Sequence, residues 1–403
     1  MHYPSPVRFR RLDNSTLRAT NESIVLNLIR ERQPISRAAL VRATGLRPST
    51  VTSIVREFIG ESLVRESGFE ASSGGRRSQL LCLDGGSSVV VGVHVGVRQT
   101  AIALSDLTGH ITEKKVLRTE REAESFLCAL ADEITNMLGA HLAPGMTCDG
   151  VGVAVPGVTD PEKGNLVYSA NLEWRNIPVR DILAQKIDRR ILIQEECRAA
   201  GLAEIWYGTL KNLTFRHMVC VSVNEGVGTG IFIGGDLFAG ASQGSGQFGH
   251  VSLDPNGAPC KCGNRGCWEV YTSDVATAAR YLDYKCGSAN GTAAELDIAE
   301  IICRAHRGDE LALKALQETG TYLGKGLAII VNALNPEMIV VAGRIAGAWK
   351  IMESHILAAL REAALSTNLE ATRLMPTRFR ENSCLLGAIS LVLSQRFLLP
   401  QFV

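Results

Sequence analysis

One imidazole and three thiols lie close together between residues 249 and 269, in the segment GHVSLDPNGAPCKCGNRGCWE. His250, Cys260, Cys262 and Cys267 form a Cys3His set, and thiolates combined with an imidazole favour zinc over the hard cations Mg²⁺ and Ca²⁺. Glycines between the cysteines let the backbone curl so that the sulfurs converge on one ion. Because four protein ligands leave no position for water, the pattern predicts a structural Zn²⁺ ion. The alternative is a loop of unpaired cysteines.

The composition sets limits on the class of protein. The chain has 403 residues, of which 46% are hydrophobic and 21% charged, so we expect two or three packed domains. Eleven cysteines are an odd number, which favours a reducing compartment over a disulfide framework. No apolar run is long enough to span a bilayer, and the N-terminus lacks the apolar segment of a secretory signal. We therefore predict a cytoplasmic protein without membrane insertion.

The zinc motif lies in a region where apolar strands and helices alternate, which is typical of an α/β fold. The two halves of this region share a loose order of strands followed by helices, which hints at duplication. The expected elements are two strands within 88–106 that close on a turn at 107–109, a helix at about 121–140, a strand at 150–155, a strand and helix within 191–208, a glycine-broken hairpin within 219–240, a strand, turn and helix within 337–365, and a last helix at 385–397.

The N-terminal segment has a different pattern, of three short helices. Apolar residues at helical spacing predict a helix with Asn21 as its N-cap, which ends at Pro34. Ser36 caps a second helix, Gly45 forms a tight turn, and a third helix opens at Pro48 or Ser49. This is the geometry of a helix-turn-helix, in which the third helix enters the major groove of DNA. The residues expected to face DNA from these helices are Arg37, Arg47, Ser49, Thr50, Ser53 and Arg56.

A basic wing is expected to follow the third helix. Two strands, at 63–65 and 79–83, flank the glycine-rich loop GFEASSGGRRS, whose Arg76 and Arg77 are suited to a minor groove or to phosphates. Residues 1–81 contain 13 arginines and no lysine against seven acidic residues, although the whole chain has a net charge of only +1. An anionic partner for this part of the chain is therefore expected. An ordinary three-helix bundle with a solvated basic surface is the alternative.

Residues 240–269 resemble the signature of the ROK family of sugar kinases and sugar-responsive repressors: a glycine-rich stretch, a Gly-Glu-x-Gly-His step and the zinc loop. The segments ISRAALVRATGLRPSTVTSIV and SSGGRRSQLLCL resemble the winged helix that the family's regulators carry, and LNPEMIVVAG and LLGAISL fit its C-terminal part. The resemblance, which runs from about Asn21 to the end of the chain, implies a ribonuclease-H-like, actin-type fold of two lobes with a sugar cleft between them.

The resemblance and the patterns together predict the domain organisation. The expected fold is an N-terminal winged helix-turn-helix followed by a two-lobed α/β domain. The predicted divisions are an N-terminal arm at 1–20, the winged helix at 21–84, a first lobe at 87–200 completed by the C-terminal helix at about 384–403, and a second lobe at 201–383 with the zinc loop at 250–267.

Two departures from the family's kinases argue against phosphoryl transfer. The kinases carry an Asp-x-Gly-Gly-Thr turn at the start of the domain, where this chain reads HVGVRQT over residues 94–100, so bulky side chains replace backbone that must approach phosphate. Their Asn-Asp pair, whose Asp is the catalytic base, corresponds to Glu195 and Glu196. An extra methylene at Glu196 misplaces a base, and errors of about 1 Å can cost 10²-fold in rate. We predict no catalytic residues and no kinase activity, with Glu196 as a degenerate base.

The resemblance also implies a set of sugar contacts. Gln247 stands where the family has glutamate; it retains an acceptor but lacks the charge. His250 is expected to serve twice, with one ring nitrogen on zinc and the other on a sugar hydroxyl. Structural roles are the alternatives: a loop cap for Asn171 and helix N-terminal acids for Glu195 and Glu269. The predicted ligand-binding residues are Asn171, Glu195, Glu196, Gln247, His250 and Glu269.

These expectations combine into one function. The chain is predicted to be a DNA-binding transcriptional regulator, a repressor of carbohydrate genes, that acts as a homodimer or tetramer on an operator in double-stranded DNA. A sugar or sugar-phosphate effector in the cleft is expected to change the spacing of the winged helices. Two alternatives stay open: an ATP-dependent sugar kinase with an accessory DNA-binding arm, and a zinc-stabilised scaffold that does not sense sugar.

Overall fold

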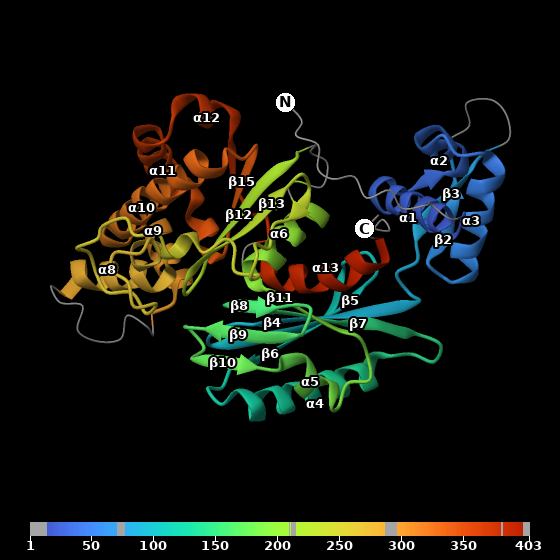
Figure 1. Cartoon of the computed structure of the whole chain (residues 1–403), viewed down its shortest axis with the longest axis horizontal. Helices are drawn as coiled ribbons and strands as arrows, with labels where there is room; N and C mark the ends of the chain where they lie inside the picture. The colour runs from blue at the N-terminus through green and yellow to red at the C-terminus, as the bar shows by residue number, and fades with distance from the viewer. Residues whose placement is uncertain are drawn as a thin grey trace.

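A computed structural model describes residues 14–70, 77–208, 210, 215–286, 296–379 and 382–397. A small N-terminal domain lies beside two larger α/β lobes, and the C-terminal helix runs between all three (Figure 1). Most of the predicted N-terminal arm, and Arg76 of the predicted wing, lie outside the described residues. Among the residues within these ranges, no helix combines the length and the apolar character needed to span a membrane.

The N-terminal domain packs three helices against a small sheet with the strand order β1-β3-β2. Ser36 caps the second helix by accepting a hydrogen bond from the Ala39 amide, and Gly45 ends that helix with φ +70°, as predicted. The turn and the following helix are therefore set by local chemistry. The elements are α1 (Asn14–Arg32), β1 (Ile35–Ser36), α2 (Arg37–Thr44), α3 (Pro48–Gly60), β2 (Val64–Phe69) and β3 (Gln79–Leu83).

The start of the first helix differs from the prediction. Helix α1 begins at Asn14, so Asn21 lies within the helix and is not its N-cap. The apolar periodicity starts only at Ile24, and the preceding turns are polar and carry no such signal. These turns are stabilised instead by ion pairs of Arg18 with Glu22 at 2.7 Å and with Glu57 of α3 at 2.5 Å.

The first lobe is built on a five-stranded sheet with the order β11-β7-β4-β5-β6. Strands β4, β7 and β11 run parallel, and β5 and β6 are antiparallel to their neighbours. Strand β6 was not predicted, because it is a largely exposed edge strand with a charged sequence, ITEKKVLR, in which no apolar alternation is visible. The strands are β4 (Ser88–Val95), β5 (Gln99–Asp106), β6 (Ile111–Arg118), β7 (Thr147–Val155) and β11 (Ile191–Glu195).

The second lobe repeats this topology. Its sheet has the order β14-β13-β12-β15-β16, in which three antiparallel strands are again followed by two parallel ones. The hint of duplication in the sequence therefore corresponds to two sheets of the same connectivity. The strands are β12 (His217–Val223), β13 (Val227–Ile233), β14 (Asp236–Leu237), β15 (Met338–Ala342) and β16 (Arg373–Pro376).

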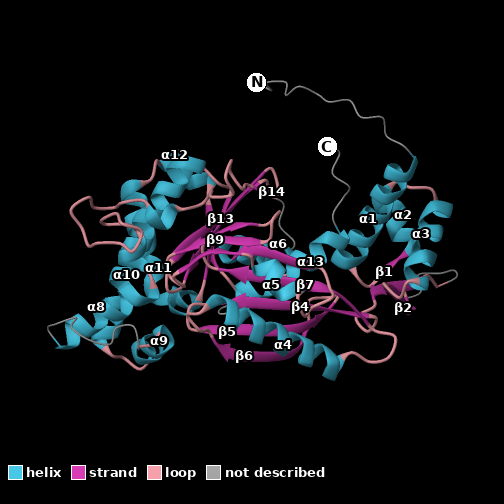
Figure 2. Cartoon of the chain, turned by 60° about the horizontal axis from the view of Figure 1, so that its bottom comes forward, coloured by secondary structure: helices cyan, strands magenta, loops and turns pink. Residues whose placement is uncertain are grey.

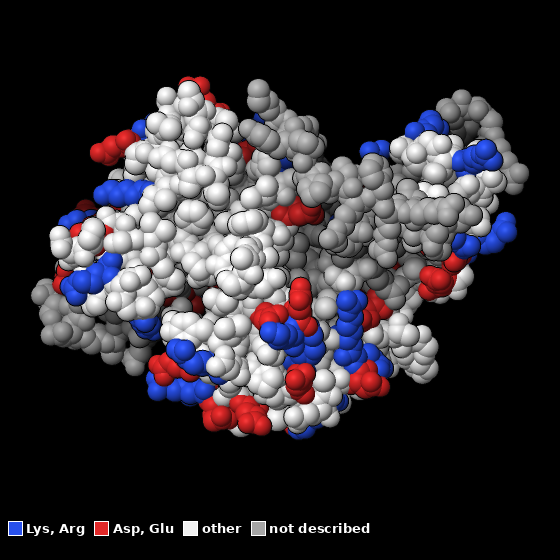
Figure 3. Space-filling model, viewed as in Figure 1, with Lys and Arg blue, Asp and Glu red and all other residues white. Residues whose placement is uncertain are grey.

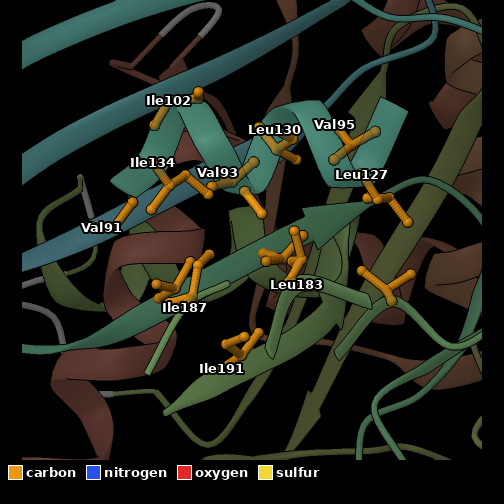
Figure 4. Packing of buried hydrophobic residues seen from close by; sticks show 14 of the residues in the cluster. Val91, Val93, Val95, Ile102, Leu127, Leu130, Ile134, Leu183, Ile187 and Ile191 are labelled. Carbon is orange, nitrogen blue, oxygen red and sulfur yellow. The ribbon is translucent and has the colours of Figure 1, made fainter. Parts of the chain in front are cut away.

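Each sheet buries one face under its own helices. In the first lobe, Leu127, Leu130 and Ile134 of α4 pack against the valines of β4 (Figure 4). Ile187 belongs to the same buried cluster. Helices α10 and α11 cover the second sheet in the same way. The outer elements are α4 (Ala123–His141), a small sheet of β8 (Val158–Asp160), β9 (Asn165–Ser169) and β10 (Trp174–Ile177), α5 (Val179–Ala184), η1 (Phe248–His250), α7 (Glu269–Thr272), α8 (Asp274–Cys286), α9 (Ile298–His306), α10 (Glu310–Leu334), η2 (Arg344–Ala348), α11 (Trp349–Ala363) and α12 (Ser366–Ala371).

Two equivalent helices, α6 (Glu196–Trp206) and α13 (Ser383–Phe397), pack against each other between the two sheets. They follow the last strand of each sheet, and Gly387 lets them approach closely, since a Cβ there would lie 2.0 Å from the Ala199 carbonyl oxygen. Helix α6 crosses the predicted division between residues 200 and 201. Its buried face contributes to a core shared by both lobes.

The N-terminal domain rests on the far ends of these two helices, as both views of the chain show (Figures 1 and 2). The guanidinium of Arg30 on α1 stacks over Trp206 of α6, 4.1 Å from the ring centroid. Trp206 in turn meets Phe397 of α13 edge to face, and the Asn27 side chain donates a hydrogen bond to the Phe397 carbonyl oxygen. The N-terminal domain is thus connected to both halves of the two-lobed domain through α6 and α13.

Candidate functional site

The structure brings His250, Cys260, Cys262 and Cys267 into one cluster. One ligand atom of each residue lies within 4.8 Å of the others. The His250 Nδ1 atom is 3.7 Å from the Cys260 sulfur, and the Cys262 and Cys267 sulfurs are also 3.7 Å apart. These are the separations that four donors around one small tetrahedral ion require, so the donor set fits a metal.

The loop that carries these cysteines is folded by its own backbone. The Cys260 amide donates to the Asn264 carbonyl oxygen, and the Gly266 amide donates to the Ala258 carbonyl oxygen. Gly266 has φ +62°, and a Cβ there would lie 1.7 Å from the Asp254 carbonyl oxygen, so the position requires glycine. Burial raises the pKa of the Cys267 thiol to about 12, so a thiolate there requires a neighbouring cation.

A small pocket of about 80 Å³ lies beside the cysteine cluster, between the two lobes. All six residues predicted to bind a ligand line this pocket, although they come from four separate segments of the chain. His250 belongs to both sites, because its Nδ1 faces the cysteine cluster while the residue also borders the pocket. The predicted residues that line the pocket are Asn171, Glu195, Glu196, Gln247, His250 and Glu269.

Glu195 has a structural contact within this pocket. Its two carboxylate oxygens accept hydrogen bonds from the amides of Cys197 and Arg198, each at 2.9 Å, so that Glu195 is the N-cap of α6. Burial raises the pKa of this carboxyl to about 7; the two amide hydrogen bonds oppose the rise and the neighbouring Glu196 adds to it. Glu195 therefore has the structural role considered as an alternative, that of an acid at a helix N-terminus, and it also lines the pocket.

A glycine-rich turn that the sequence analysis did not assign to the site forms another wall of the pocket. The Glu269 carboxylate accepts a hydrogen bond from the Val227 amide at 3.0 Å, which holds the β12–β13 turn against the pocket. A Cβ on Gly226 would lie 2.5 Å from Glu269 and 2.9 Å from Asn171. Glycine at every second position from 226 to 230 is the sequence feature that could have indicated a close approach of the backbone to other groups here.

Arg198 is a second residue that the sequence analysis missed. Its side chain is buried and donates hydrogen bonds to the carbonyl oxygens of Ala239, Gln243 and Ser245. It thereby fastens the loop that leads to Gln247 onto the helix that Glu195 caps. No local pattern marks this role, because an arginine in an amphipathic helix is usually solvated.

The segment at the kinase-like turn lines a larger cavity of about 300 Å³ next to the pocket. The Nε2 atom of His94, the residue predicted to replace the aspartate of the kinases, is 2.8 Å from the carboxylate of Glu196. Val97 and Arg98 line the same cavity. The carboxylate of Glu196, the predicted degenerate base, thus already has a partner.

Several separate Lys or Arg side chains are visible on the surface of the N-terminal domain in Figure 3. The burial of the predicted DNA-facing residues can be followed along the chain, except for Arg76, which lies outside the described residues. On α3 the side chains of Val51, Ile54, Val55 and Phe58 are buried. Thr50 is half-buried. Arg37 is half-buried and pairs with Glu66 of β2 at 2.9 Å. The exposed members of the predicted set are Arg47, Ser49, Ser53, Arg56 and Arg77.

Comparisons with known proteins agree with this organisation. The sequence model of the ROK family matches residues 90–395. A xylose repressor of Bacillus subtilis (strain 168) is 32% identical over 386 residues, which cover 94% of this chain and 97% of that protein. A crystal structure of a ROK family transcriptional regulator, a homolog of the E. coli MLC protein, superimposes with a TM-score of 0.78 at 27% identity and covers 95% of this chain and 97% of that one.

An enzyme shares the fold of the two lobes. A ROK family glucokinase from Streptomyces griseus, in complex with glucose and AMPPNP, matches with a TM-score of 0.65 at 23% identity. That match covers 98% of the glucokinase chain but only 75% of this chain. The two lobes therefore have the actin-like sugar-kinase fold. On the match of the family model and the similarity along nearly the whole length, this chain belongs to the ROK family.

Proposed function

We propose that this protein is a sugar-responsive transcriptional repressor. One observation carries the proposal: the chain adds a basic N-terminal domain, with an exposed polar face on α3, to lobes whose fold a kinase possesses without that domain. The similarity to the xylose repressor extends over 94% of the chain and so includes this domain. The protein acts in the cytoplasm, where its operator lies.

The N-terminal domain is the DNA reader, a winged helix-turn-helix. Helix α3 enters the major groove with Arg47, Ser49, Ser53 and Arg56, because these exposed side chains lie opposite its buried face. Strands β2 and β3 belong to the wing, and Arg77, just before β3, contacts a phosphate or a minor groove. Two such domains in a dimer or tetramer read two half-sites.

The pocket between the lobes binds the effector, a monosaccharide or its derivative. Amide, carboxylate and imidazole groups converge there, and these are the groups that hydrogen-bond hydroxyls in several directions. Phosphoryl transfer is not part of the function, since Glu196 is paired with His94 and side chains occupy the phosphate-binding turn.

The ion in the Cys3His cluster is Zn²⁺ in a structural role. Zinc–sulfur bonds of about 2.3 Å in a tetrahedral centre place two thiolates about 3.8 Å apart, close to the 3.7 Å between Cys262 and Cys267. The residues that hold the ion are His250, Cys260, Cys262 and Cys267. By orienting the imidazole of His250, the ion positions one wall of the effector pocket.

Helix α6 couples the two sites. Its first turn, at Glu195 and Glu196, borders the pocket, and its last residue, Trp206, contacts Arg30 of the N-terminal domain. A sugar that prefers one arrangement of the lobes displaces α6 and α13 and changes the spacing of the two DNA readers. A ligand with equal affinity for both arrangements would have no effect.

A gel-shift titration of the purified chain against its own promoter region tests the proposal. We expect retardation of that fragment in preference to random DNA, and its release by one or more sugars of a monosaccharide panel. Arg56→Ala should weaken operator binding by roughly 1–3 kcal/mol, whereas Arg361→Ala, an exposed residue on α11, should leave it unchanged.

Failure to retard duplex DNA at low salt, together with rapid ADP release on a hexose, would overturn the assignment in favour of a kinase. If the chain bound its operator specifically but no sugar altered that binding, the N-terminal domain would still be a DNA-binding domain, but control by sugar would be excluded.

A further inference from the structure

A second group of metal-ligating side chains lies at the junction of the two lobes. His94 comes from the end of β4, Glu196 from the start of α6 and Cys384 from the first turn of α13, and one donor atom of each lies within 4.8 Å of the others. We propose that His94, Glu196 and Cys384 form a second binding site, distinct from the Cys3His cluster, for a divalent cation of the zinc class. The proposal does not depend on the proposed regulatory function.

The donor set selects the class of cation. An imidazole, a carboxylate and a thiolate together are typical ligands of Zn²⁺ and its neighbours among the transition metals, whereas Mg²⁺ and Ca²⁺ favour oxygen donors alone. Glu195 adjoins the site as a further carboxylate, and Glu225 lines the same cavity. The local charge therefore favours a cation.

The geometry requires only a small adjustment. Two bonds of about 2.0 Å at a tetrahedral angle would separate the His94 and Glu196 donors by about 3.3 Å, against the 2.8 Å of their present hydrogen bond. Their side chains are 19% and 16% exposed and face a cavity, so both have room to turn. Cys384 is 4% exposed and is held in place by the packing of α13 against α6.

Three basic residues, Arg98, Lys114 and Arg344, line the same cavity, and the side chains of two of them contact other groups. Arg344, which lines the same cavity, pairs with Asp297 at 2.8 Å and lies within 4 Å of Glu225 and Asp274. Lys114 donates a hydrogen bond to Asn382 at 2.8 Å. Neither side chain therefore occupies the position that the cation would take.

Three protein ligands would leave one coordination position open, in contrast to the four of the Cys3His cluster. That position faces the cavity of about 300 Å³ that borders the effector pocket. An oxygen of water, or of a hydroxylated or anionic ligand in the cleft, would complete the coordination. An ion at this second site would thus be exchangeable, whereas an ion in the Cys3His cluster would have four protein ligands.

Metal stoichiometry tests the assignment. The full chain is equilibrated by dialysis against zinc chloride, and bound zinc is measured by mass spectrometry of the metal. We expect two zinc ions per chain for the wild type and one for His94→Gln and for Cys384→Ser. The matched controls, His110→Gln at an exposed histidine and Cys128→Ser at a half-buried cysteine, should keep both ions.

Cobalt substitution supplies a second readout. Thiolate-to-cobalt charge-transfer absorption should fall in Cys384→Ser by the contribution of one of four thiolates, while the spectrum of the other three persists. A single bound zinc ion in the wild type would overturn the proposal, and so would two ions retained by both His94→Gln and Cys384→Ser. In that case His94 and Glu196 form an ordinary hydrogen-bonded pair beside a buried thiol.

Discussion

Glu195 and His250 each combine a structural contact with a place in the pocket between the lobes, the proposed effector site. Glu195 caps α6 with both carboxylate oxygens, and His250 directs Nδ1 to the cysteine cluster. Each residue therefore connects the pocket to a rigid part of the molecule. A ligand that contacts either side chain acts directly on α6 or on the metal loop.

The pH dependence of stability should report the buried state of Glu195. Its native pKa of about 7 lies above the ordinary value of 4.5, so its contribution is fully present below about pH 4.5 and is lost as the pH rises through 7. Between pH 5 and pH 8 the free energy of unfolding of the wild type should fall by up to about 3 kcal/mol relative to Glu195→Gln. Denaturant unfolding at both pH values measures the difference, and Glu362→Gln, at an exposed position, should follow the wild type.

Removal of the proposed structural ion should loosen the loop of residues 250–267. Cys262→Ser should lose one zinc ion per chain, melt several degrees lower and bind the effector more weakly, since His250 is no longer oriented. Lys261→Ser, at the exposed neighbouring position, is the matched control and should retain the ion and the melting temperature. Zinc analysis with thermal melts checks both, and an unchanged zinc content in Cys262→Ser would contradict the assignment of this residue as a ligand.

At the scale of the elements, α2 and α3 differ in how freely their arginines can reach DNA. Arg37 on α2 is engaged by Glu66 at 2.9 Å, whereas Arg56 on α3 is exposed. A phosphate must compete with Glu66 for Arg37. We therefore expect Arg37→Ala to cost less operator affinity than Arg56→Ala, with a smaller change in salt dependence. Fluorescence anisotropy over a salt series measures both, and an equal or larger loss for Arg37→Ala would show that the ion pair breaks on DNA.

The contact of α6 with the N-terminal domain leads to a second prediction at the scale of the elements. Arg30→Met keeps the aliphatic stem over Trp206 but removes the cation, so the sugar-dependent change in operator affinity should shrink by about 1 kcal/mol, roughly fivefold. Arg32→Met, an exposed arginine on the same helix, is the control and should leave the coupling intact. The ratio of the operator dissociation constants with and without sugar measures how strongly the sugar affects DNA binding. If this ratio were the same in Arg30→Met as in the wild type, the contact of Arg30 with Trp206 would not transmit the effect of the sugar.

At the scale of the whole molecule, two lobes of the same topology face each other across α6 and α13, and the pocket lies between them. A sugar in the pocket should therefore stabilise the folded state against unfolding by mass action, by about 2.7 kcal/mol at 100 times its Kd. Thermal melts over a monosaccharide panel should show a shift for the effector that Asn171→Ala abolishes and Asn136→Ala, an exposed control, retains. A coupled assay should detect no ADP release with that sugar, and turnover above background would contradict the regulatory assignment.

Many features of the fold could be predicted from local sequence patterns. The cysteine spacing identified a loop whose His and Cys side chains lie close enough to hold a metal ion. The Ser36 cap and the Gly45 turn identified two helices, and apolar runs located most strands. These features depend on neighbours within one element or loop, so their spacing along the chain is sufficient. The charged edge strand β6 and the polar start of α1 were not predicted, because neither buries a regular apolar face.

The pocket residues were placed by resemblance, and only the tertiary structure showed that six side chains from distant segments line one cavity. The same holds for the His94, Glu196 and Cys384 group, for Arg198 and for the contact of Arg30 with Trp206. Each depends on how two sheets and two helices cross in space. Spacing along a chain determines which residues share an element, but the packing of elements determines which residues of different elements meet.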